Sequence, residues 1–222
     1  MTEASKPIAL VTGASRGIGA AAAIALAATH HVILTARKEA DLAAVEGKIH
    51  GRGGTATIAP FDLTDNDAID RLAAAIGARW GRLDTLVLNA GMLPSLTPVP
   101  HIDPKDWDKT LALNLTANWR LIRAFDPWLR QSAAADVIAV TSSLGSKPKP
   151  YWGVYAASKA ALESLIAIYG LEVGNITAIR THIVDPGATR TAMRARAYPG
   201  ENPSDVKPPE DAAAKIIAAL AR

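Results

Sequence analysis

The sequence predicts a single α/β domain over residues 1–222, with a doubly wound parallel sheet of about six strands, and three observations favour this fold class. Short, nearly continuous apolar runs alternate with longer Ala- and Leu-rich segments of helical period, which is typical of repeated strand–helix–strand units. Most runs are apolar at almost every position, as expected when helices cover both faces of a sheet. The length of 222 residues suits one such domain, and no linker or repeat divides the chain.

The predicted strands and helices alternate along the chain. A side-chain oxygen of Thr64 or Asp65 can cap the third helix, and Asp103-Pro104 gives the fourth a cap and a proline that fits the first turn. In order, the strands are IALVT (8–12), VILT (32–35), TATIA (55–59), TLVLN (85–89), VIAVT (137–141) and TAIRTHIV (177–184). The helices span residues 17–29, 39–50, 66–80, 104–130, 154–172 and 209–221.

Composition and charge exclude several classes of site and partner. The chain has no cysteine, which excludes disulfides, thiolate metal sites and a cysteine nucleophile, and we predict no metal site. The net charge of +3 comes from scattered basic residues without a Lys/Arg block, so nucleic acid is not an expected partner. The first seven residues do not resemble a signal peptide, and the longest apolar stretch, residues 19–28, is far shorter than the ~20 residues of a membrane span. We therefore predict a cytoplasmic protein without a membrane partner.

A glycine-rich turn follows the first predicted strand. Residues 12–19 read Thr-Gly-Ala-Ser-Arg-Gly-Ile-Gly and lead directly into a helix. Glycine suits this place because the backbone must turn sharply and approach a pyrophosphate closely, while the helix N-terminus offers free amides to the anion. The spacing is Gly-x-x-x-Gly-x-Gly rather than the Gly-x-Gly-x-x-Gly of the usual dinucleotide fingerprint. Taken alone, this motif could also be a tight turn without a ligand.

At this point the sequence resembles the short-chain dehydrogenase/reductase (SDR) family, whose Thr-Gly-x-x-x-Gly-x-Gly motif it matches at Thr12, Gly13, Gly17 and Gly19. The resemblance covers residues 8–191 and implies a Rossmann-like sheet of order 3-2-1-4-5-6 that binds a nicotinamide dinucleotide. Family members generally continue into a seventh strand, which we expect to be missing here. In the turn, the residues expected to contact the cofactor are Gly13, Ser15, Arg16, Gly17, Ile18 and Gly19.

The residues after the second strand indicate which dinucleotide is bound. Enzymes that bind NAD usually place an acid there to hold the ribose 2′-hydroxyl, but this chain has Ala36 followed by Arg37. Arg37 and Arg16 resemble the family's arrangement for NADP(H), in which two guanidinium groups flank the 2′-phosphate. Each charge-assisted bond is worth about 1.5–3 kcal/mol, so we predict a preference for NADP(H) of at least about tenfold. The alternative is that Arg37 is only a solvated surface arginine.

Two further matches lie at the ends of the third and fourth strands. In the family, an acid placed like Asp62, with the backbone of Leu63 beside it, contacts the adenine ring; Asp62 alone would be read as a turn residue or helix cap. Asn89-Ala90-Gly91 matches the family's Asn-Ala-Gly, which supports the sheet and leaves room for the adenosine half of the cofactor.

Residues 140–164 contain the residue types needed for chemistry at a carbonyl. Hydride transfer to a carbonyl carbon leaves a proton to be moved at oxygen, so a general acid/base and hydrogen-bond donors are required there. Tyr155 and Lys159 lie four residues apart, hence on one face of the predicted helix. A tyrosine that acts as a base near neutral pH needs its pKa lowered from about 10 to about 7, and a nearby lysine ammonium would stabilise the phenolate.

The resemblance implies a role for each member of a set of four. Ser142 lies 13 positions before Tyr155, with a glycine three residues after it, and is expected to donate a hydrogen bond to the substrate oxygen; Ser143 is a neighbouring candidate. Tyr155 gives or takes the proton, and Lys159 holds the nicotinamide ribose and tunes Tyr155. Asn114 matches the family's asparagine that anchors a water between the lysine and solvent.

The segment after the sixth strand matches the family's Pro-Gly-x-x-x-Thr at Pro186, Gly187 and Thr191. There the backbone near Thr189 and the hydroxyl of Thr191 hold the nicotinamide carboxamide and fix which ring face is presented. Taken alone, Pro-Gly is simply a turn signal.

Residues 192–209 are predicted to act as a substrate lid, and the stretch 198–209 within them is predicted to be a long loop. The stretch is rich in proline, and long loops in compact domains are often functional. Together with residues 92–98 and 144–152 it is expected to wall the substrate site. Arg194 or Arg196 could bind an anionic substrate, although surface solubility explains these arginines as well.

A missing seventh strand would remove one common family interface and leave the one between the fourth and fifth helices. We therefore expect a homodimer. Trp107, Trp119 and Trp128 could supply its apolar surface, although a place in the core suits each of them equally well.

The resemblance as a whole implies an NADP(H)-dependent oxidoreductase that interconverts a carbonyl and a secondary alcohol, with ketones, aldehydes or 3-oxoacyl compounds as candidate substrates. The alternatives are a dinucleotide-sensing protein without turnover and a lyase or epimerase of the same family. An intact set of Ser142, Tyr155 and Lys159 argues against the first, and the lack of extra substrate-binding sequence argues against the second.

Overall fold

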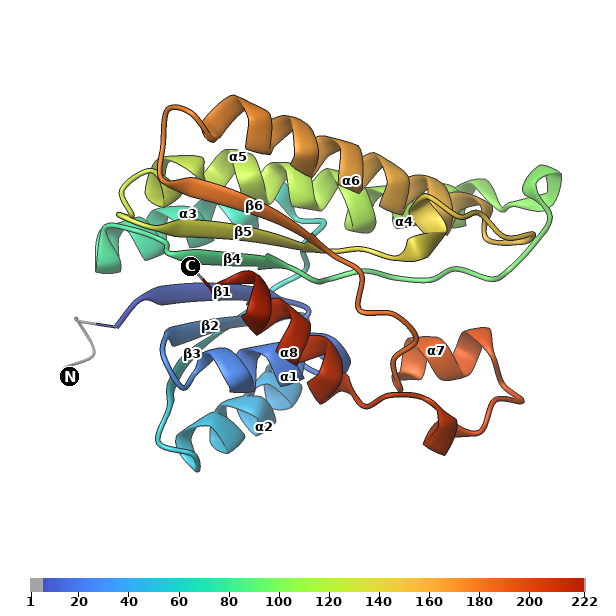
Figure 1. Cartoon of the computed structure of the whole chain (residues 1–222), viewed down its shortest axis with the longest axis horizontal. Helices are drawn as coiled ribbons and strands as arrows, with labels where there is room; N and C mark the ends of the chain where they lie inside the picture. Colours follow the sequence, from blue (N-terminus) through green and yellow to red (C-terminus); the bar gives the residue numbers. More distant parts are fainter. Residues whose placement is uncertain (1–5, 222) are drawn as a thin grey trace.

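A parallel sheet of six strands lies between two layers of helices in the computed structural model, which describes residues 6–221 (Figure 1). The strands are β1 Ile8–Thr12, β2 His31–Ala36, β3 Thr55–Pro60, β4 Thr85–Leu88, β5 Ala135–Val140 and β6 Ile179–Val184. Their order is β3-β2-β1-β4-β5-β6, and every adjacent pair is parallel. The predicted fold class and strand order are confirmed.

Helices cover both faces of the sheet. They are α1 Gly17–Leu26, α2 Glu39–His50, α3 Asn66–Trp80, α4 Pro104–Leu111, α5 Ala117–Leu129, α6 Gly153–Val173, α7 Ala192–Ala197 and α8 Pro209–Ala219. Shorter helical turns are η2 Val99–His101, η3 Ala112–Thr116, η4 Ser143–Gly145 and η5 Pro203–Asp205. Helices α1, α2 and α8 lie on one face, and α3, α5 and α6 lie on the other (Figure 1).

The continuous apolar runs arise because both faces of the central strands are buried. Along β1, Ile8 and Leu10 pack into the cluster beside α3, α5 and α6, whereas Ala9 and Val11 pack into the cluster beside α1, α2 and α8. Burying a large aliphatic side chain contributes roughly 1.5–3 kcal/mol. The strands therefore stabilise two helical layers at once, which explains why most positions along the central strands are apolar.

The fourth predicted helix, residues 104–130, is interrupted in the structure by a π-helical turn. This turn, η3, lies between α4 and α5. A π turn shifts backbone hydrogen bonds away from their i−4 partners, and here the side-chain amide of Asn118 donates to the Asn114 carbonyl at 2.7 Å. Neither proline nor glycine marks the turn, so helical periodicity alone predicts an uninterrupted helix.

The sixth strand begins two residues later than the sequence predicts, at Ile179 instead of residue 177. The reason lies in Thr177, whose hydroxyl donates to the Val173 carbonyl at 2.8 Å and accepts from the Ile179 amide at 3.1 Å. Thr177 therefore closes the end of α6 rather than extending β6.

The predicted loop at 198–209 contains one short helical turn, η5, and the proposed lid at 192–209 begins with a helix, α7. Its two ends meet: Thr189 and Lys207 form a parallel bridge, and the Arg190 amide donates to the Lys207 carbonyl at 2.8 Å. In Figure 1 the segment lies beyond the carboxyl ends of the strands. The segment therefore consists of ordered helical turns whose two ends are joined by the Thr189–Lys207 bridge.

Within the described residues, α6 is the helix long and apolar enough to cross a membrane by length and composition, with a mean hydropathy of 1.2. It contributes Leu162 and Ile166 to the core cluster. A core helix passes the same test, so this property is a weak indication of a membrane span.

The strand order reverses direction between β1 and β4, because the chain continues from β1 to β2 on one side and later returns to β4 on the other. In open parallel sheets, a crevice for ligands forms outside the carboxyl ends of the strands at this switch point. The glycine-rich turn follows β1 and Asn89 follows β4, so both lie at the switch point.

Candidate active site

The glycine-rich turn needs glycine at three positions for geometric reasons. Gly13 and Gly17 have φ angles of +65° and +57°, in the left-handed region that favours glycine. A Cβ on Gly19 would lie 2.3 Å from the Gly13 carbonyl oxygen. Side chains at these positions would therefore strain the turn or separate it from α1.

Thr12 and Asn89 fix this turn to the end of β4. The Thr12 hydroxyl accepts hydrogen bonds from the amides of Asn89 at 2.9 Å and Ala90 at 3.0 Å. The Asn89 side-chain amide donates to the Thr12 carbonyl at 2.8 Å. A Cβ on Gly13 would come within 3.0 Å of Ala90 Cα. The structure thus places Asn89 and Ala90 beneath the turn, where they hold its backbone in place.

The N-terminus of α1 keeps free backbone amides. Its N-cap residue, Arg16, is extended and makes no side-chain capping bond, and the first turn contains no acidic residue. Such a terminus attracts an anion. The exposed side chains of Arg16 and Arg37 follow β1 and β2, neighbouring strands of the sheet. Residues 36–38 include no carboxylate that would repel a phosphate.

Asp62 closes a tight turn after β3. One of its carboxylate oxygens accepts from the Thr64 amide at 2.9 Å and from the Thr64 hydroxyl at 2.8 Å. The bond from the amide holds the pKa of Asp62 below its usual value, and the positive charge of Arg37 adds to this effect. The side chain of Leu63 is buried in the core. Asp62 therefore has the turn role that its type alone suggests, and a contact with adenine stays a prediction.

Lys159 is buried on the face of α6 that points towards the end of β5. Its Nζ donates to the Val140 carbonyl at 2.8 Å and lies 5.9 Å from the centre of the Tyr155 ring. Burial lowers the pKa of Lys159 to about 8, and the negative charge of Glu163 opposes this effect. The ammonium is therefore mostly charged at neutral pH, but a small further change in its surroundings would neutralise it.

Tyr155 is buried beside Lys159, and burial raises the pKa of Tyr155 to about 12. A hydrogen bond with Ser142 acts in the opposite direction, and the negative charge of Asp185 adds to the rise. The lowered pKa that a tyrosine base needs is thus not reached in the protein alone, because burial has the largest effect on Tyr155. The Lys159 ammonium donates to the Val140 carbonyl instead. At neutral pH Tyr155 is a phenol that can donate a proton.

Asn114 joins two segments next to the lysine. It is fully buried in η3, and its side-chain Oδ1 accepts from the Met92 backbone amide at 2.8 Å. Its side-chain Nδ2 donates to the Met92 backbone carbonyl at 3.0 Å and to Ser158 Oγ at 3.1 Å. A Cβ on Gly91 would lie 3.3 Å from Asn114 Oδ1 and 3.7 Å from Lys159 Nζ. The structure therefore brings Asn114, Gly91 and Lys159 together. Ser158 was not predicted from the sequence as part of this group. The pattern that could have indicated it is a polar residue on the buried side of a helix.

The segment after β6 returns to the glycine-rich turn. Gly187 has a φ of +75°, and the buried Thr189 donates its hydroxyl to the Gly187 carbonyl at 3.1 Å. Thr191 caps α7 by accepting from the Arg194 amide at 3.2 Å, and its Cγ2 lies 3.3 Å from where a Cβ on Gly17 would stand. Two motifs far apart in the sequence therefore border the same crevice.

Three aromatic rings connect α6 with α7. The Trp152 ring lies edge-on to Tyr155 at 5.7 Å between centres, and the Tyr198 ring lies 6.0 Å from that of Trp152. On the other side, Arg196 donates to the Leu93 carbonyl at 2.7 Å. The 192–209 segment thus touches both of the other stretches that the sequence places around the substrate.

Both arginines of this segment have partners within the protein. Arg194 forms a two-pronged ion pair with Glu201, with Nε 2.6 Å from Oε2, and its guanidinium lies 3.7 Å from the centre of the Tyr198 ring. Arg196 donates its hydrogen bond to the Leu93 backbone carbonyl. These contacts stabilise the segment itself, so neither arginine needs an anionic substrate to explain it. The ion pair of Glu201 with Arg194 was not predicted, because two charged residues on either side of a turn have no periodic sequence pattern.

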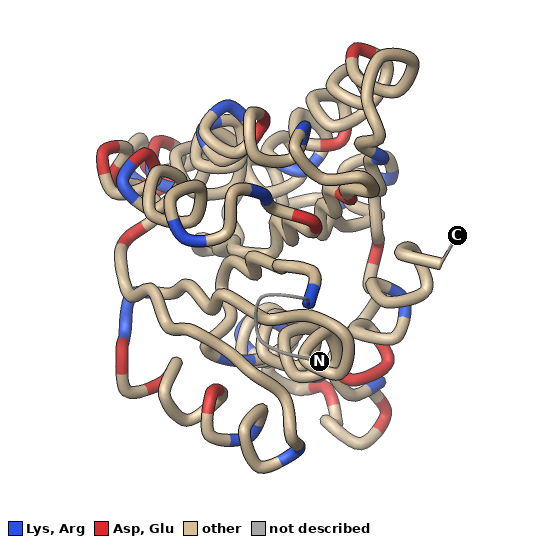
Figure 2. The backbone as a smooth tube through the Cα atoms, turned by 90° about the vertical axis from the view of Figure 1, so that its left-hand side faces the viewer, with Lys and Arg blue, Asp and Glu red and all other residues tan. Residues whose placement is uncertain are grey.

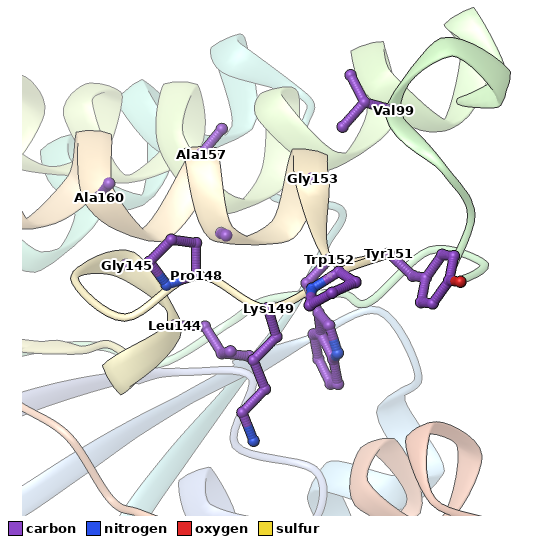
Figure 3. A pocket seen from close by; sticks show the side chains of 12 residues that line it. Val99, Leu144, Gly145, Pro148, Lys149, Tyr151, Trp152, Gly153, Ala157 and Ala160 are labelled. Atoms are coloured by element: carbon purple, nitrogen blue, oxygen red, sulfur yellow. The ribbon is translucent and has the colours of Figure 1, made fainter.

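A cavity of about 350 Å³ opens beside the site, on the outer side of α6 (Figure 3). Ala156, Ala157 and Ala160 line it on the helix, and the 144–152 stretch lines it opposite. Successive residues are about 100° apart around a helix, so these alanines face away from the side that carries Tyr155. The cavity therefore adjoins the reacting centre without containing it.

Lys and Arg are interspersed with Asp and Glu along the described backbone (Figure 2). The candidate tryptophans divide into two groups. Trp107 and Trp119 are 40% and 43% exposed. Trp128 packs against the core, where a Cβ on Gly77 would lie 2.1 Å from its ring.

Within residues 6–221, no group of three or more metal-ligating side chains comes together.

This chain is similar to known proteins in both sequence and structure. Residues 7–202 match the model of a family described as short chain dehydrogenase. The chain is similar to the Escherichia coli K12 oxidoreductase YciK, at 37% identity over 210 residues that cover 92% of this chain and 82% of YciK. It is also similar to the structure of a Pseudomonas syringae protein described as a short chain dehydrogenase (40% identity, TM-score 0.90, covering 95% of this chain and 87% of that one). An Escherichia coli CFT073 protein of the same description, complexed with NADPH, is 34% identical, with a TM-score of 0.90 and coverage of 100% of this chain and 94% of that one.

Proposed function

This chain belongs to the short-chain dehydrogenase/reductase family and is an oxidoreductase, and we propose that it interconverts a carbonyl compound and a secondary alcohol with NADP(H). One observation carries this proposal: Tyr155, with Ser142 bonded to it and Lys159 beside it, lies buried at the carboxyl end of β5. Ketones, aldehydes and 3-oxoacyl compounds are the proposed substrate types. We also propose a cytoplasmic location, with a small molecule rather than nucleic acid or membrane as the partner.

The residues around the crevice fit NADP(H). The free amides at the start of α1 suit the pyrophosphate, and Arg16 and Arg37 suit the 2′-phosphate. When bound, NADPH supplies the hydride. The residues proposed to hold the cofactor are Gly13, Ser15, Arg16, Gly17, Ile18, Gly19, Arg37, Asp62, Leu63, Asn89, Ala90, Gly91, Tyr155, Lys159, Pro186, Gly187, Thr189 and Thr191.

The protein's own residues would manage the proton. In carbonyl reduction, the Tyr155 phenol donates its proton to the substrate oxygen, while Ser142 donates a hydrogen bond to the same oxygen. The charged Lys159 holds the nicotinamide ribose and stabilises the tyrosinate that remains. Asn114 supports the route by which Tyr155 regains a proton from solvent.

The raised pKa of Tyr155 keeps its hydroxyl in the protonated form that carbonyl reduction uses. A phenol with a pKa of about 12 is protonated at pH 7, which is the form a proton donor requires. Alcohol oxidation needs the phenolate, so it requires the positive charges of Lys159 and of oxidised nicotinamide close to Tyr155. Near neutral pH the resting protein therefore presents Tyr155 as a proton donor.

The test is consumption of NADPH with a panel of ketones, aldehydes, quinones and 3-oxoacyl thioesters. We expect NADPH oxidation with at least one class, accompanied by formation of the alcohol. Tight NADPH binding without turnover on any class would favour the dinucleotide-sensing alternative instead.

The proposed lid, residues 192–209, gives a separate prediction. Changing Arg196 to Ala removes the bond to the Leu93 carbonyl, so we expect KM for the carbonyl substrate to rise about three- to tenfold. The affinity for NADPH should not change. Steady-state kinetics measure both, with Arg52→Ala, an exposed arginine between α2 and β3, as the control. An unchanged KM would contradict a lid role.

We propose a homodimer formed through the 104–130 helical segment and α6. Trp119 and Ile168 are 43% and 50% exposed on these elements, and apolar side chains of this kind mark association surfaces. Light scattering should give twice the 23.2 kDa mass of one chain. Ile168→Glu should give a monomer, whereas Ile176→Glu, an equally apolar exposed site beyond α6, should not. A monomeric wild-type protein would overturn this proposal.

A further inference from the structure

Glu163 lies on α6 two helical turns after Tyr155 and one turn after Lys159. It is partly buried, and its carboxylate accepts a short hydrogen bond from the hydroxyl of Thr141. Thr141 is itself buried and directly precedes the proposed substrate-oxygen donor, Ser142. The Glu163 carboxylate is therefore fixed between α6, which carries Tyr155 and Lys159, and the residue that precedes Ser142.

This contact is the last of three between α6 and the end of β5. The Tyr155 hydroxyl bonds to Ser142, and Lys159 Nζ donates to the Val140 carbonyl. Glu163 accepts from Thr141, which lies between Val140 and Ser142. Since residues four apart lie on one side of a helix, three successive turns of α6 each bind one residue of the 140–142 segment.

Close packing leaves the η4 turn little freedom at the same place. A Cβ on Gly145 would lie 3.0 Å from the Glu163 carboxylate and 3.1 Å from the Ala160 amide nitrogen. Figure 3 shows Gly145 beside α6, near Ala160. The glycine therefore allows the turn that begins at Ser142 to rest against the carboxylate of Glu163.

We propose that Glu163 is a positioning residue for the reaction, which holds Thr141 and the Ser142 turn against α6 and sets a negative charge one helical turn from Lys159. The inference rests on the proposed function. The other titratable groups that act at this site are Tyr155, on the same helix, and Asp185, whose charge acts on Tyr155 from beyond β6.

The electrostatic part of this role has a definite sign. Burial lowers the pKa of Lys159 and the charge of Glu163 raises it. Without that charge, Lys159 loses its proton at a lower pH. Because the charged lysine is proposed to hold the nicotinamide ribose, the alkaline limit of NADPH binding should then move to lower pH.

Two substitutions separate the charge from the hydrogen bond. Glu163→Gln keeps an oxygen for Thr141 but loses the charge, so the alkaline limb of NADPH binding and of kcat/KM should move down by about one pH unit. Thr141→Val loses the bond but keeps the charge, so kcat should fall about tenfold with the limb in place. Thr141→Ser should restore kcat to within about twofold of wild type. Glu172→Gln, an exposed glutamate of the same helix, is the control.

Fluorescence titration of NADPH across pH reads the charge effect without turnover. If the limb is present in wild type and unchanged in Glu163→Gln, or if Thr141→Val keeps wild-type kcat, this inference is wrong while the proposed function stands. If wild type itself shows no NADPH binding, the proposed function fails, and the inference fails with it. The Thr141 pair tests the contact from β5 in the event that Glu163→Gln does not fold.

Discussion

Tyr155→Phe is expected to lower kcat for NADPH-dependent carbonyl reduction by roughly 10²–10⁴-fold, the usual contribution of a positioned general acid. Phenylalanine keeps the buried ring and its edge-on contact with Trp152, but it has no proton to donate. The affinity for NADPH should change little, because the charge of Lys159 and the glycine-rich turn are untouched. Initial rates of NADPH oxidation and fluorescence titration of NADPH measure the two quantities.

Tyr151→Phe is the matched control for this substitution. Tyr151 lies four residues earlier, in the 144–152 stretch proposed to wall the substrate site, and is 57% exposed, so loss of its hydroxyl should affect KM at most and leave kcat unchanged. A kcat of Tyr155→Phe that equals that of wild type would remove Tyr155 from the mechanism. Equal losses in both variants would point to a disturbed 144–155 region rather than to lost acid catalysis.

The second large effect concerns the choice of dinucleotide. Replacing both Arg16 and Arg37 by alanine is expected to weaken NADPH binding by roughly 100-fold or more, since each charge-assisted bond to a phosphate is worth about 1.5–3 kcal/mol. Binding of NADH should change much less, because NADH has no 2′-phosphate. Titration calorimetry with both dinucleotides measures the ratio, and the wild type should prefer NADPH by at least about tenfold.

Lys38→Ala controls for a general loss of positive charge, because Lys38 is exposed and directly follows Arg37. It should leave the ratio of the two affinities near that of wild type. Wild-type protein that binds NADPH and NADH equally would contradict the assignment of Arg16 and Arg37 to the 2′-phosphate. A parallel loss of NADH affinity in the double variant would instead assign the arginines to the shared part of the dinucleotide.

Much of the fold could be predicted because its signals are local. Runs such as 8–12 and 32–35 are apolar throughout since both faces of these strands are buried. The glycine-rich turn was equally legible, because Gly13 and Gly17 adopt backbone angles that few other residues tolerate. Asp103 before Pro104 predicted a helix start, and the structure shows its carboxylate accepting from the Lys105 amide at 2.7 Å.

The remainder depends on tertiary contacts that no spacing encodes. The π turn at Ala112–Thr116 involves a side-chain amide bond from Asn118, which a periodicity argument does not register. The structure of residues 192–209 depends on contacts with Leu93 and Trp152, which are distant in sequence. The sequence indicates that a tyrosine base needs a lowered pKa, but not that burial raises the pKa of Tyr155 in the protein alone. Proximity of Lys159 in sequence did not reveal that its ammonium would be directed at the Val140 carbonyl.

One stoichiometric measurement tests whether this protein reduces a carbonyl compound with NADPH. Wild-type protein at pH 7 is incubated with NADPH and a panel of carbonyl compounds, and NADPH consumed is compared with alcohol formed. We expect at least one carbonyl to be reduced, with one alcohol formed per NADPH oxidised, and we expect Tyr155→Phe to lose this activity. Saturable binding of NADPH without oxidation by any carbonyl, or turnover that Tyr155→Phe retains in full, would contradict this expectation.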